Sequence, residues 1–161
     1  MPPMLLRDGR IVADDWQYGD TEPAGPHGLI LPFDRWQGER ETWLARSRPL
    51  GVVLTPAHKV ELLAPDLARL ALVAVEFPGP SEGRGYSQGR LLRERWNFAG
   101  ELRAVGYVRQ DQLFFLARCG FNAFELPEGE LESARAAFAA FSAAYQASND
   151  TGLPFKLRHR V

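Results

Sequence analysis

Short apolar runs alternate with segments of helical periodicity along most of the chain. The apolar runs predict five β-strands, at 29–31, 51–54, 72–77, 101–108 and 123–126. Helical patterns follow the strands at about 34–45, 60–70, 87–96 and 111–119, and an alanine-rich helix follows the acidic turn at 128–132. A strand followed each time by a helix predicts an α/β fold with a mainly parallel five-stranded sheet and helices on both faces. Strand order stays open, so a partial or irregular β/α barrel is the alternative.

The first residues have a different pattern. Short runs at 5–7 and 10–12, each with two apolar residues, flank the pair Asp8-Gly9, which suits the positive φ angles of a two-residue turn, and this predicts a short N-terminal β-hairpin. A loop rich in Pro and Gly follows at 19–28. We interpret 1–161 as a single domain, with the hairpin and loop at 1–28, the β/α core at 29–147 and a basic tail at 148–161.

Composition limits the possible functions. The chain of 161 residues is 45% hydrophobic with a net charge of −1, so nothing draws it as a whole to nucleic acid or to a membrane surface. Its single cysteine, Cys119, excludes an internal disulfide and a cysteine-based zinc or iron–sulfur site held by this chain alone. The three histidines are too scattered to predict a metal site. No signal-peptide core or apolar run of ~20 residues is present, which predicts a cytoplasmic protein.

The segment 82–112 carries the candidate chemistry. A glycine-rich turn leads into a helix there, beside arginines whose planar guanidinium groups can grip an oxyanion with two hydrogen bonds. The carboxyl ends of parallel strands are also where binding sites gather. The sequence therefore predicts an anion site formed by Arg84, Tyr86, Ser87, Arg90 and Arg103, with Glu101, Asp111 and Gln112 as possible additional members.

Structural roles compete with this interpretation. Ser87 and Asp111 can simply cap helices. Glu101 and Arg103 alternate along one strand, so their side chains point to one face and can form a buried ion pair. The turn Gly83-Arg84-Gly85 fails the dinucleotide fingerprint, because Gln88 stands where the third glycine belongs. No cofactor is predicted.

Several motifs stand close together in this half of the chain: Gly83-Arg84-Gly85-Tyr86-Ser87, Arg90-Leu91-Leu92-Arg93, Glu101-Leu102-Arg103-Ala104-Val105-Gly106, Asp111-Gln112, Arg118-Cys119-Gly120-Phe121 and Ala123-Phe124. Together they resemble an uncharacterised bacterial family, "domain of unknown function 934". The resemblance covers nearly the whole chain. Members of that family usually carry Gly-Asp where this chain has Gly106-Tyr107, so a carboxylate is missing here, and the effect of Tyr107 stays open.

The resemblance implies a function in sulfur metabolism. The first hypothesis is an accessory protein of assimilatory sulfite reduction, with sulfite reductase or its reductant as partner and no redox cofactor of its own. The alternative is a small-molecule enzyme or sensor that holds a sulfur oxyanion or phosphorylated metabolite in an arginine-lined pocket. Whether the chain catalyses a reaction, which ligand it binds and its oligomeric state are left open.

Overall fold

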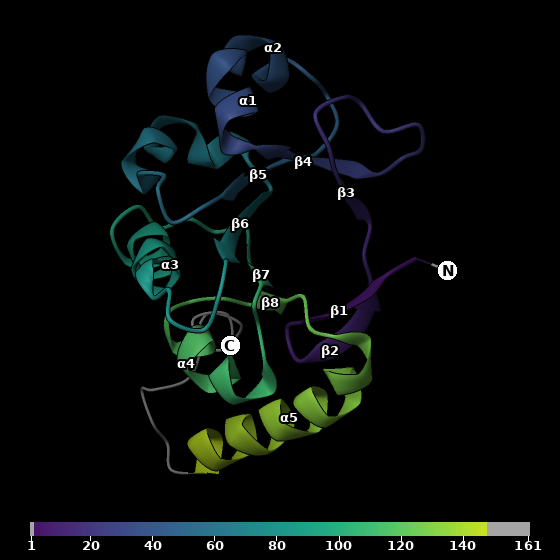
Figure 1. The fold of residues 1–161 in the computed structure, drawn as a ribbon, viewed down its shortest axis with the longest axis vertical. Helices are drawn as coiled ribbons and strands as arrows, with labels where there is room; N and C mark the ends of the chain where they lie inside the picture. Colours follow the sequence, from purple (N-terminus) through teal and green to yellow (C-terminus); the bar gives the residue numbers. More distant parts are fainter. Residues whose placement is uncertain (1, 148–161) are drawn as a thin grey trace.

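The computed structural model describes residues 2–147, with side chains as far as Phe141, so the predicted tail at 148–161 lies outside the described residues. Within that range the backbone forms one sheet of eight strands in the order β2-β1-β8-β7-β6-β5-β4-β3. The strands are β1 (Met4–Arg7), β2 (Arg10–Ala13), β3 (Trp16–Tyr18), β4 (Gly28–Pro32), β5 (Leu50–Leu54), β6 (Leu72–Phe77), β7 (Glu101–Gly106) and β8 (Ala123–Phe124). The sheet curls into a half-barrel (Figure 1).

Strands β3 to β8 are parallel and lie side by side in chain order. The predicted hairpin is present: β1 pairs with β2 antiparallel, and β1 also pairs with β8 antiparallel. Its turn takes positive φ at both central residues, 52° at Asp8 and 80° at Gly9, as the Asp-Gly pair predicted. The hairpin therefore extends the same sheet beyond β8.

The helices lie on the outer face of the curled sheet (Figure 1). They are α1 (Phe33–Gly38), α2 (Arg40–Leu44), α3 (Arg84–Glu94), α4 (Leu113–Arg118) and α5 (Leu131–Ala147), with 3-10 turns η1 (Val60–Leu62), η2 (Ala64–Arg69), η3 (Gln110–Gln112) and η4 (Glu128–Glu130). Crossovers between parallel strands are right-handed, so strands added in chain order send every helix to the same side. The predicted five-stranded parallel sheet with helices on both faces is wrong, and the alternative of a partial barrel fits.

One parallel strand, β3, was not predicted at all. It is three residues long and pairs with β4, with Trp16 opposite Gly28 and Tyr18 opposite Ile30. Only Asp14 and Asp15 separate it from β2, the strand at the other edge of the sheet. Three Cα–Cα steps span at most about 11 Å, so the two edges of the curled sheet are held close to each other.

The two faces of the sheet differ. Apolar side chains on the outer face, such as Val73, Val75 and Leu102, join the main core under the helices. The inner face holds a smaller apolar cluster of Ile30, Leu72, Ala74 and Val105, against which Trp16 and Val53 pack. Alternation along β7 places Arg103 and Val105 on this inner face while Leu102 and Ala104 face the helices.

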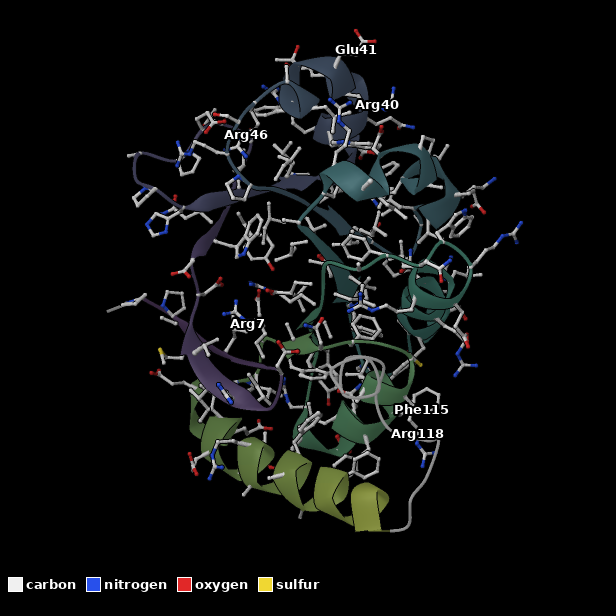
Figure 2. The ribbon with its side chains drawn as sticks, turned by 180° about the vertical axis from the view of Figure 1, so that it is seen from behind. Arg7, Arg40, Glu41, Arg46, Phe115 and Arg118 are labelled. Atoms are coloured by element: carbon white, nitrogen blue, oxygen red, sulfur yellow. The ribbon has the colours of Figure 1, made fainter. Side chains whose placement is uncertain are left out.

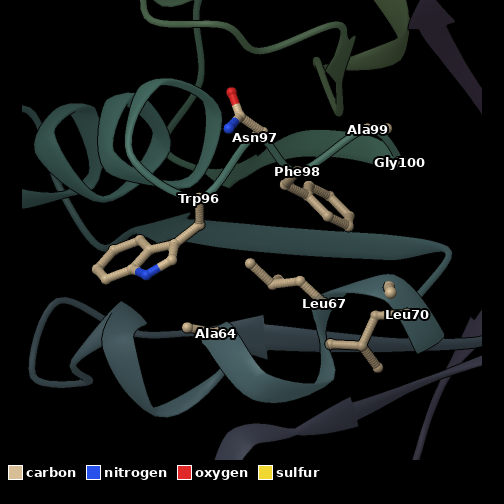
Figure 3. Close-up of a pocket in the computed structure, with 9 residues that line it drawn as sticks. Ala64, Leu67, Leu70, Trp96, Asn97, Phe98, Ala99 and Gly100 are labelled. Carbon is tan, nitrogen blue, oxygen red and sulfur yellow. The ribbon is translucent and has the colours of Figure 1, made fainter.

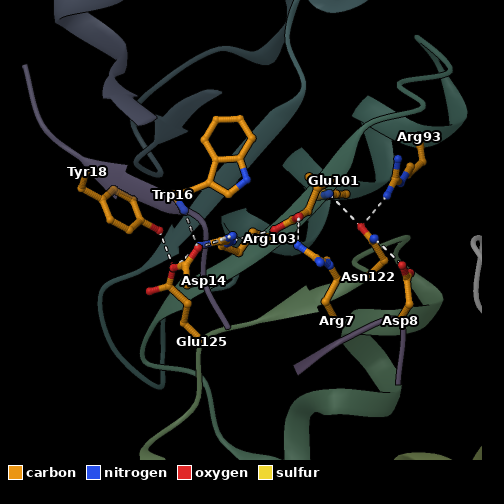
Figure 4. Close-up of polar contacts among 11 residues, drawn as sticks. Arg7, Asp8, Asp14, Trp16, Tyr18, Arg93, Glu101, Arg103, Asn122 and Glu125 are labelled. Carbon is orange, nitrogen blue, oxygen red and sulfur yellow. Dashed lines mark hydrogen bonds and ion pairs between the residues drawn. The ribbon is translucent and has the colours of Figure 1, made fainter. Parts of the chain in front are cut away.

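A buried arginine ties the amino ends of the last strands together. The guanidinium of Arg93, on α3, donates to the carbonyls of Phe98, Gly100 and Gly120 at 2.6–2.8 Å. It also donates to the side-chain oxygen of Asn122 at 2.9 Å (Figure 4). Burial lowers the pKa of Arg93 to about 10. These bonds fix the end of α3 against the starts of β7 and β8.

Candidate functional site

The predicted site residues on α3 lie at the protein surface. The side chain of Arg84 is 68% exposed, and its Nε lies 3.1 Å from Oε1 of Glu82 in the preceding loop. Ser87 is exposed and is not the predicted cap, because α3 already begins at Arg84 and has no side-chain cap. Arg90 is also exposed, with its Nε 3.8 Å from Glu94 one turn further along the helix. Each of these two arginines therefore has a local carboxylate partner.

Tyr86 and Gln112 contact each other on the helical face. The Tyr86 ring packs against Phe77 and Phe115, with ring centroids 5.0 and 4.8 Å away. Its hydroxyl accepts a hydrogen bond from Nε2 of Gln112 at 3.1 Å. The side-chain oxygen of Gln112 in turn accepts from the backbone N–H of Arg109 at 2.7 Å. Asp111, also in η3, is exposed.

Arg103 points to the other face of the sheet. Helix α3 packs on β6 from outside, whereas Arg103 lies on the inner face of the neighbouring strand β7. The structure thus divides the predicted residues into a surface group on the helical side and the Glu101–Arg103 pair on the inner side. An anion site formed by all of them stays a prediction, and these positions give it no common pocket.

The inner face instead holds a compact charged network around Arg103 (Figure 4). The side chain of Arg103 is fully buried and contacts three carboxylates. Its Nε donates to Glu101 at 2.8 Å, and its two terminal nitrogens donate to both oxygens of Asp14 at 2.9 and 3.1 Å. Nη1 also donates to Glu125 at 2.9 Å. The expected ion pair between Glu101 and Arg103 is therefore present, as part of a larger network.

Further residues extend the network in two directions. Arg7 of β1 donates to Oε1 of Glu101 at 3.3 Å. Tyr18 at the end of β3 donates its hydroxyl proton to Oε2 of Glu125 at 2.5 Å. Asp14 also accepts the backbone N–H of Trp16 at 3.0 Å, which fixes the chain where it passes from one sheet edge to the other. The network therefore links strands from both edges of the half-barrel.

Burial and neighbouring charges determine the protonation of two hydrogen-bond donors in the network, Arg103 and Tyr18. Burial alone would lower the pKa of Arg103, but the carboxylates of Asp14, Glu101 and Glu125 outweigh it and hold the pKa above its ordinary value. Partial burial, followed by the charge of Glu125, raises the pKa of Tyr18 well above its ordinary value of 10. Arg103 therefore stays charged and Tyr18 stays a hydrogen-bond donor at neutral pH.

A cavity of about 450 Å³ opens beside this network. Asp14, Trp16, Tyr18, Glu125 and Leu126 contribute to its walls. Tyr18 ends β3 and Glu125 directly follows β8, so the cavity lies at the carboxyl ends of parallel strands, where sites in β/α barrels are built. It is the candidate functional site that the geometry favours.

A second cavity, of about 380 Å³, is shown in Figure 3. Leu67, Trp96, Phe98 and Gly100 line it, and Gly100 directly precedes β7. It therefore sits at the amino end of that strand, the side of a β/α barrel that serves stability. We assign it no function.

Sequence reasoning found part of the network around Arg103. It named Glu101 and Arg103, and it indicated the carboxyl ends of the parallel strands, the end at which Glu125 follows β8. It missed Asp14 and Tyr18, because the first 28 residues were read as a hairpin and a loop outside the core. The alternation of Trp16 and Tyr18 about Gln17 was the available signal for a strand.

The described residues lack two features that would define a class of protein. Within 2–147, no group of three His, Cys, Asp or Glu side chains is arranged to hold a metal ion. The same residues contain no helix with the length and apolarity needed to cross a bilayer. The fold and its network thus define an α/β half-barrel protein with a charged inner face.

Comparison with known families gives the identity at family level. The model of the family described as "Bacterial protein of unknown function (DUF934)" matches residues 51–155. The match spans more than half of the chain, and this protein belongs to that family. No curated protein matches the chain.

Proposed function

We propose that this protein is an accessory protein of assimilatory sulfite reduction that acts with sulfite reductase and carries no redox cofactor of its own. Membership of the DUF934 family supports the proposal through the function that the family resemblance implies. An accessory role also suits a chain with one cysteine, because cysteine-ligated iron–sulfur clusters take four thiolates.

The partners and burial of the polar side chains favour an accessory role over that of an enzyme. Arg103 is enclosed by three carboxylates, and both ring nitrogens of His58 have partners, the Thr55 N–H at 2.9 Å and Asp34 at 3.4 Å. Burial raises the pKa of the Cys119 thiol, which disfavours a thiolate nucleophile. These groups are arranged to hold the fold together rather than to transfer protons or attack a substrate.

An exposed phenylalanine beside a partly buried tyrosine gives the proposed partner a surface to contact. Phe115 on α4 is 51% exposed and stands edge-on to Tyr86 of α3. Arg118 lies next to Phe115 on the outer surface (Figure 2). Aromatic residues and arginine are the types enriched at protein interfaces. We infer that this surface, defined by Tyr86, Phe115 and Arg118, contacts the reductase or its reductant.

A deletion strain tests the proposed function. We expect it to grow poorly with sulfate or sulfite as the sulfur source and normally with sulfide or cysteine, because only the step from sulfite to sulfide would be impaired. Normal growth on sulfite would refute the proposal. Poor growth on sulfate alone, with normal growth on sulfite, would assign the protein to a step that precedes the formation of sulfite and would also refute the proposal.

A pull-down from sulfate-grown cells tests the surface. The wild-type protein should recover sulfite reductase or its reductant, and Phe115→Ser should recover several-fold less. Leu62→Ser is the matched control, since Leu62 is 45% exposed but lies in η1, which contributes no residue to this surface. Equal losses in both variants, or in neither, would rule out this surface.

A further inference from the structure

The inner network carries one more negative charge than positive. It contains three carboxylates, those of Asp14, Glu101 and Glu125, and two guanidinium groups, those of Arg7 and Arg103. Three negative charges against two positive charges leave a surplus of one negative charge. A surplus of charge in a partly buried network is costly unless water or a group of opposite sign balances it. An added anion would enlarge the imbalance, whereas an added cation would remove it.

The surplus is accessible at one residue, Glu125. Its side chain is 32% exposed, compared with 11% for Glu101 and 8% for Asp14. Its Oε2 accepts from Arg103 and from Tyr18, but among the side chains described, those up to Phe141, none donates a hydrogen bond to its Oε1. Glu125 lines the cavity of about 450 Å³. The accessible acceptor of the network therefore belongs to a wall of that cavity.

Aromatic rings form other parts of the wall. Trp16 and Tyr18 occupy alternate positions of β3, so both point to the inner face. The Trp16 ring lies directly over Gly28 of β4, where a Cβ would come within 2.6 Å of it. This contact holds the indole in place. A cation beside such rings gains a further attraction from their π faces.

A metal ion does not fit this arrangement. The guanidinium of Arg103 already lies between the carboxylates, and among the residues described in the structure no three such side chains form a metal-holding group. The volume of the cavity falls in the range of small-molecule sites, roughly 300–1,000 Å³. An ammonium or guanidinium group on a small organic body matches both the charge and the aromatic wall.

We propose that this cavity binds a small organic cation, whose ammonium or guanidinium group donates to Oε1 of Glu125 while its apolar part lies against Trp16 and Tyr18. The site goes beyond the proposed role in sulfite reduction and does not depend on it. Growth of the deletion strain tests that role, and ligand binding to the purified protein tests the cavity, so either can fail alone.

Calorimetric titration of the purified full chain with benzylamine tests the site. Benzyl alcohol is the matched ligand, because it keeps the ring and a hydrogen-bond donor but has no charge. We expect benzylamine to bind with one-to-one stoichiometry and benzyl alcohol to bind at least about tenfold more weakly, since a charge-assisted hydrogen bond is lost. This comparison needs no variant, so it stands whether or not a variant folds.

Glu125→Gln assigns the binding to this cavity. The amide keeps an oxygen that can accept from Arg103 and Tyr18 but removes the charge, so benzylamine affinity should fall at least about tenfold. Glu132→Gln, which removes a carboxylate from the outer surface of α5, should leave affinity unchanged. No benzylamine binding, equal binding of the two ligands, or unchanged affinity in a folded Glu125→Gln would each overturn the proposal.

Discussion

Removal of the Arg103 guanidinium should destabilise the protein strongly and in a pH-dependent way. Arg103→Met keeps an unbranched side chain of similar length but leaves the carboxylates of Asp14, Glu101 and Glu125 facing one another on the inner face. Arg103 makes four hydrogen bonds to these groups and its side chain is fully buried. Loss of one partner of a buried ion pair costs about 3–5 kcal/mol. This is a large part of the roughly 5–15 kcal/mol that stabilises a typical domain.

The pH dependence separates charge repulsion from lost packing. The pKa of Arg103 is raised above its ordinary value, so its stabilising effect in the wild type is fully present below the pKa of an unfolded arginine and is constant between pH 5 and 8. In Arg103→Met the clustered carboxylates repel one another, and the repulsion falls as they take up protons at acid pH. The loss relative to wild type should therefore be at least about 1 kcal/mol smaller at pH 5 than at pH 7.5.

Urea unfolding followed by circular dichroism at both pH values measures this difference. For a chain of this size, the loss at neutral pH corresponds to a fall in Tm of roughly 6–20 °C. Arg84→Met is the control, because it breaks an ion pair on the surface and should change stability little. The reasoning would be refuted if Arg103→Met lost the same free energy at pH 5 and pH 7.5, or no more than Arg84→Met.

Three further predictions follow from local geometry. Gly120→Ala should lower the free energy of unfolding, measured in urea, by about 2–4 kcal/mol, because Gly120 has a φ of +106° and a Cβ there would overlap the side chain of Arg93. An unchanged free energy of unfolding would contradict this. The Cys119 thiol, buried and with a raised pKa, should react with a thiol reagent at pH 8 only as fast as the chain unfolds, and prompt reaction in the native protein would count against its burial. The pKa of Tyr18 is raised by partial burial and by Glu125, so the stability that Tyr18 contributes is present below pH 10 and is lost as pH rises further, because the tyrosine of the unfolded chain ionises first. The free energy of unfolding of Tyr18→Phe should therefore fall less between pH 9 and 11 than that of the wild type, and parallel curves for the two proteins would refute the raised pKa.

The element pattern of the core could be predicted because it is local. The strand predicted at 72–77 agrees with β6 at both ends, and Asp8 and Gly9 take the positive φ angles predicted for their turn. Helix type was less predictable. The helix expected at 34–45 is divided into α1 and α2 at Glu39, and the one expected at 60–70 consists of two 3-10 turns, because packing against the sheet overrides weak helical propensity in short segments.

The face covered by helices was wrongly predicted because strand order is a long-range property. A run of apolar residues such as 72–77 has the same appearance in an open sheet and in a half-barrel, and only the order of neighbours decides where each crossover helix lies. With both faces expected to meet helices, Arg103 was grouped with the arginines of α3. In the half-barrel, the alternate β7 residues Glu101, Arg103 and Val105 face inward. Arg103 therefore forms an ion pair with Asp14, whereas Arg84 pairs with Glu82 on the outer surface.

Closure of the half-barrel and the charged network depend on each other. The segment from Asp14 to Tyr18 crosses from the edge strand β2 to the edge strand β3, and it contributes one residue bonded to Arg103 and one bonded to Glu125. Hydrophobic burial alone would not select this path, because β3 is only three residues long and Tyr18 is 46% exposed. The ion pair between Asp14 and Arg103 supplies the missing specificity, since a buried guanidinium is stable only where acceptors are positioned to receive its hydrogen bonds, and Asp14 supplies two of them here. The cavity beside Glu125 is formed where that segment arrives, so the contacts that close the sheet also shape the proposed cation site.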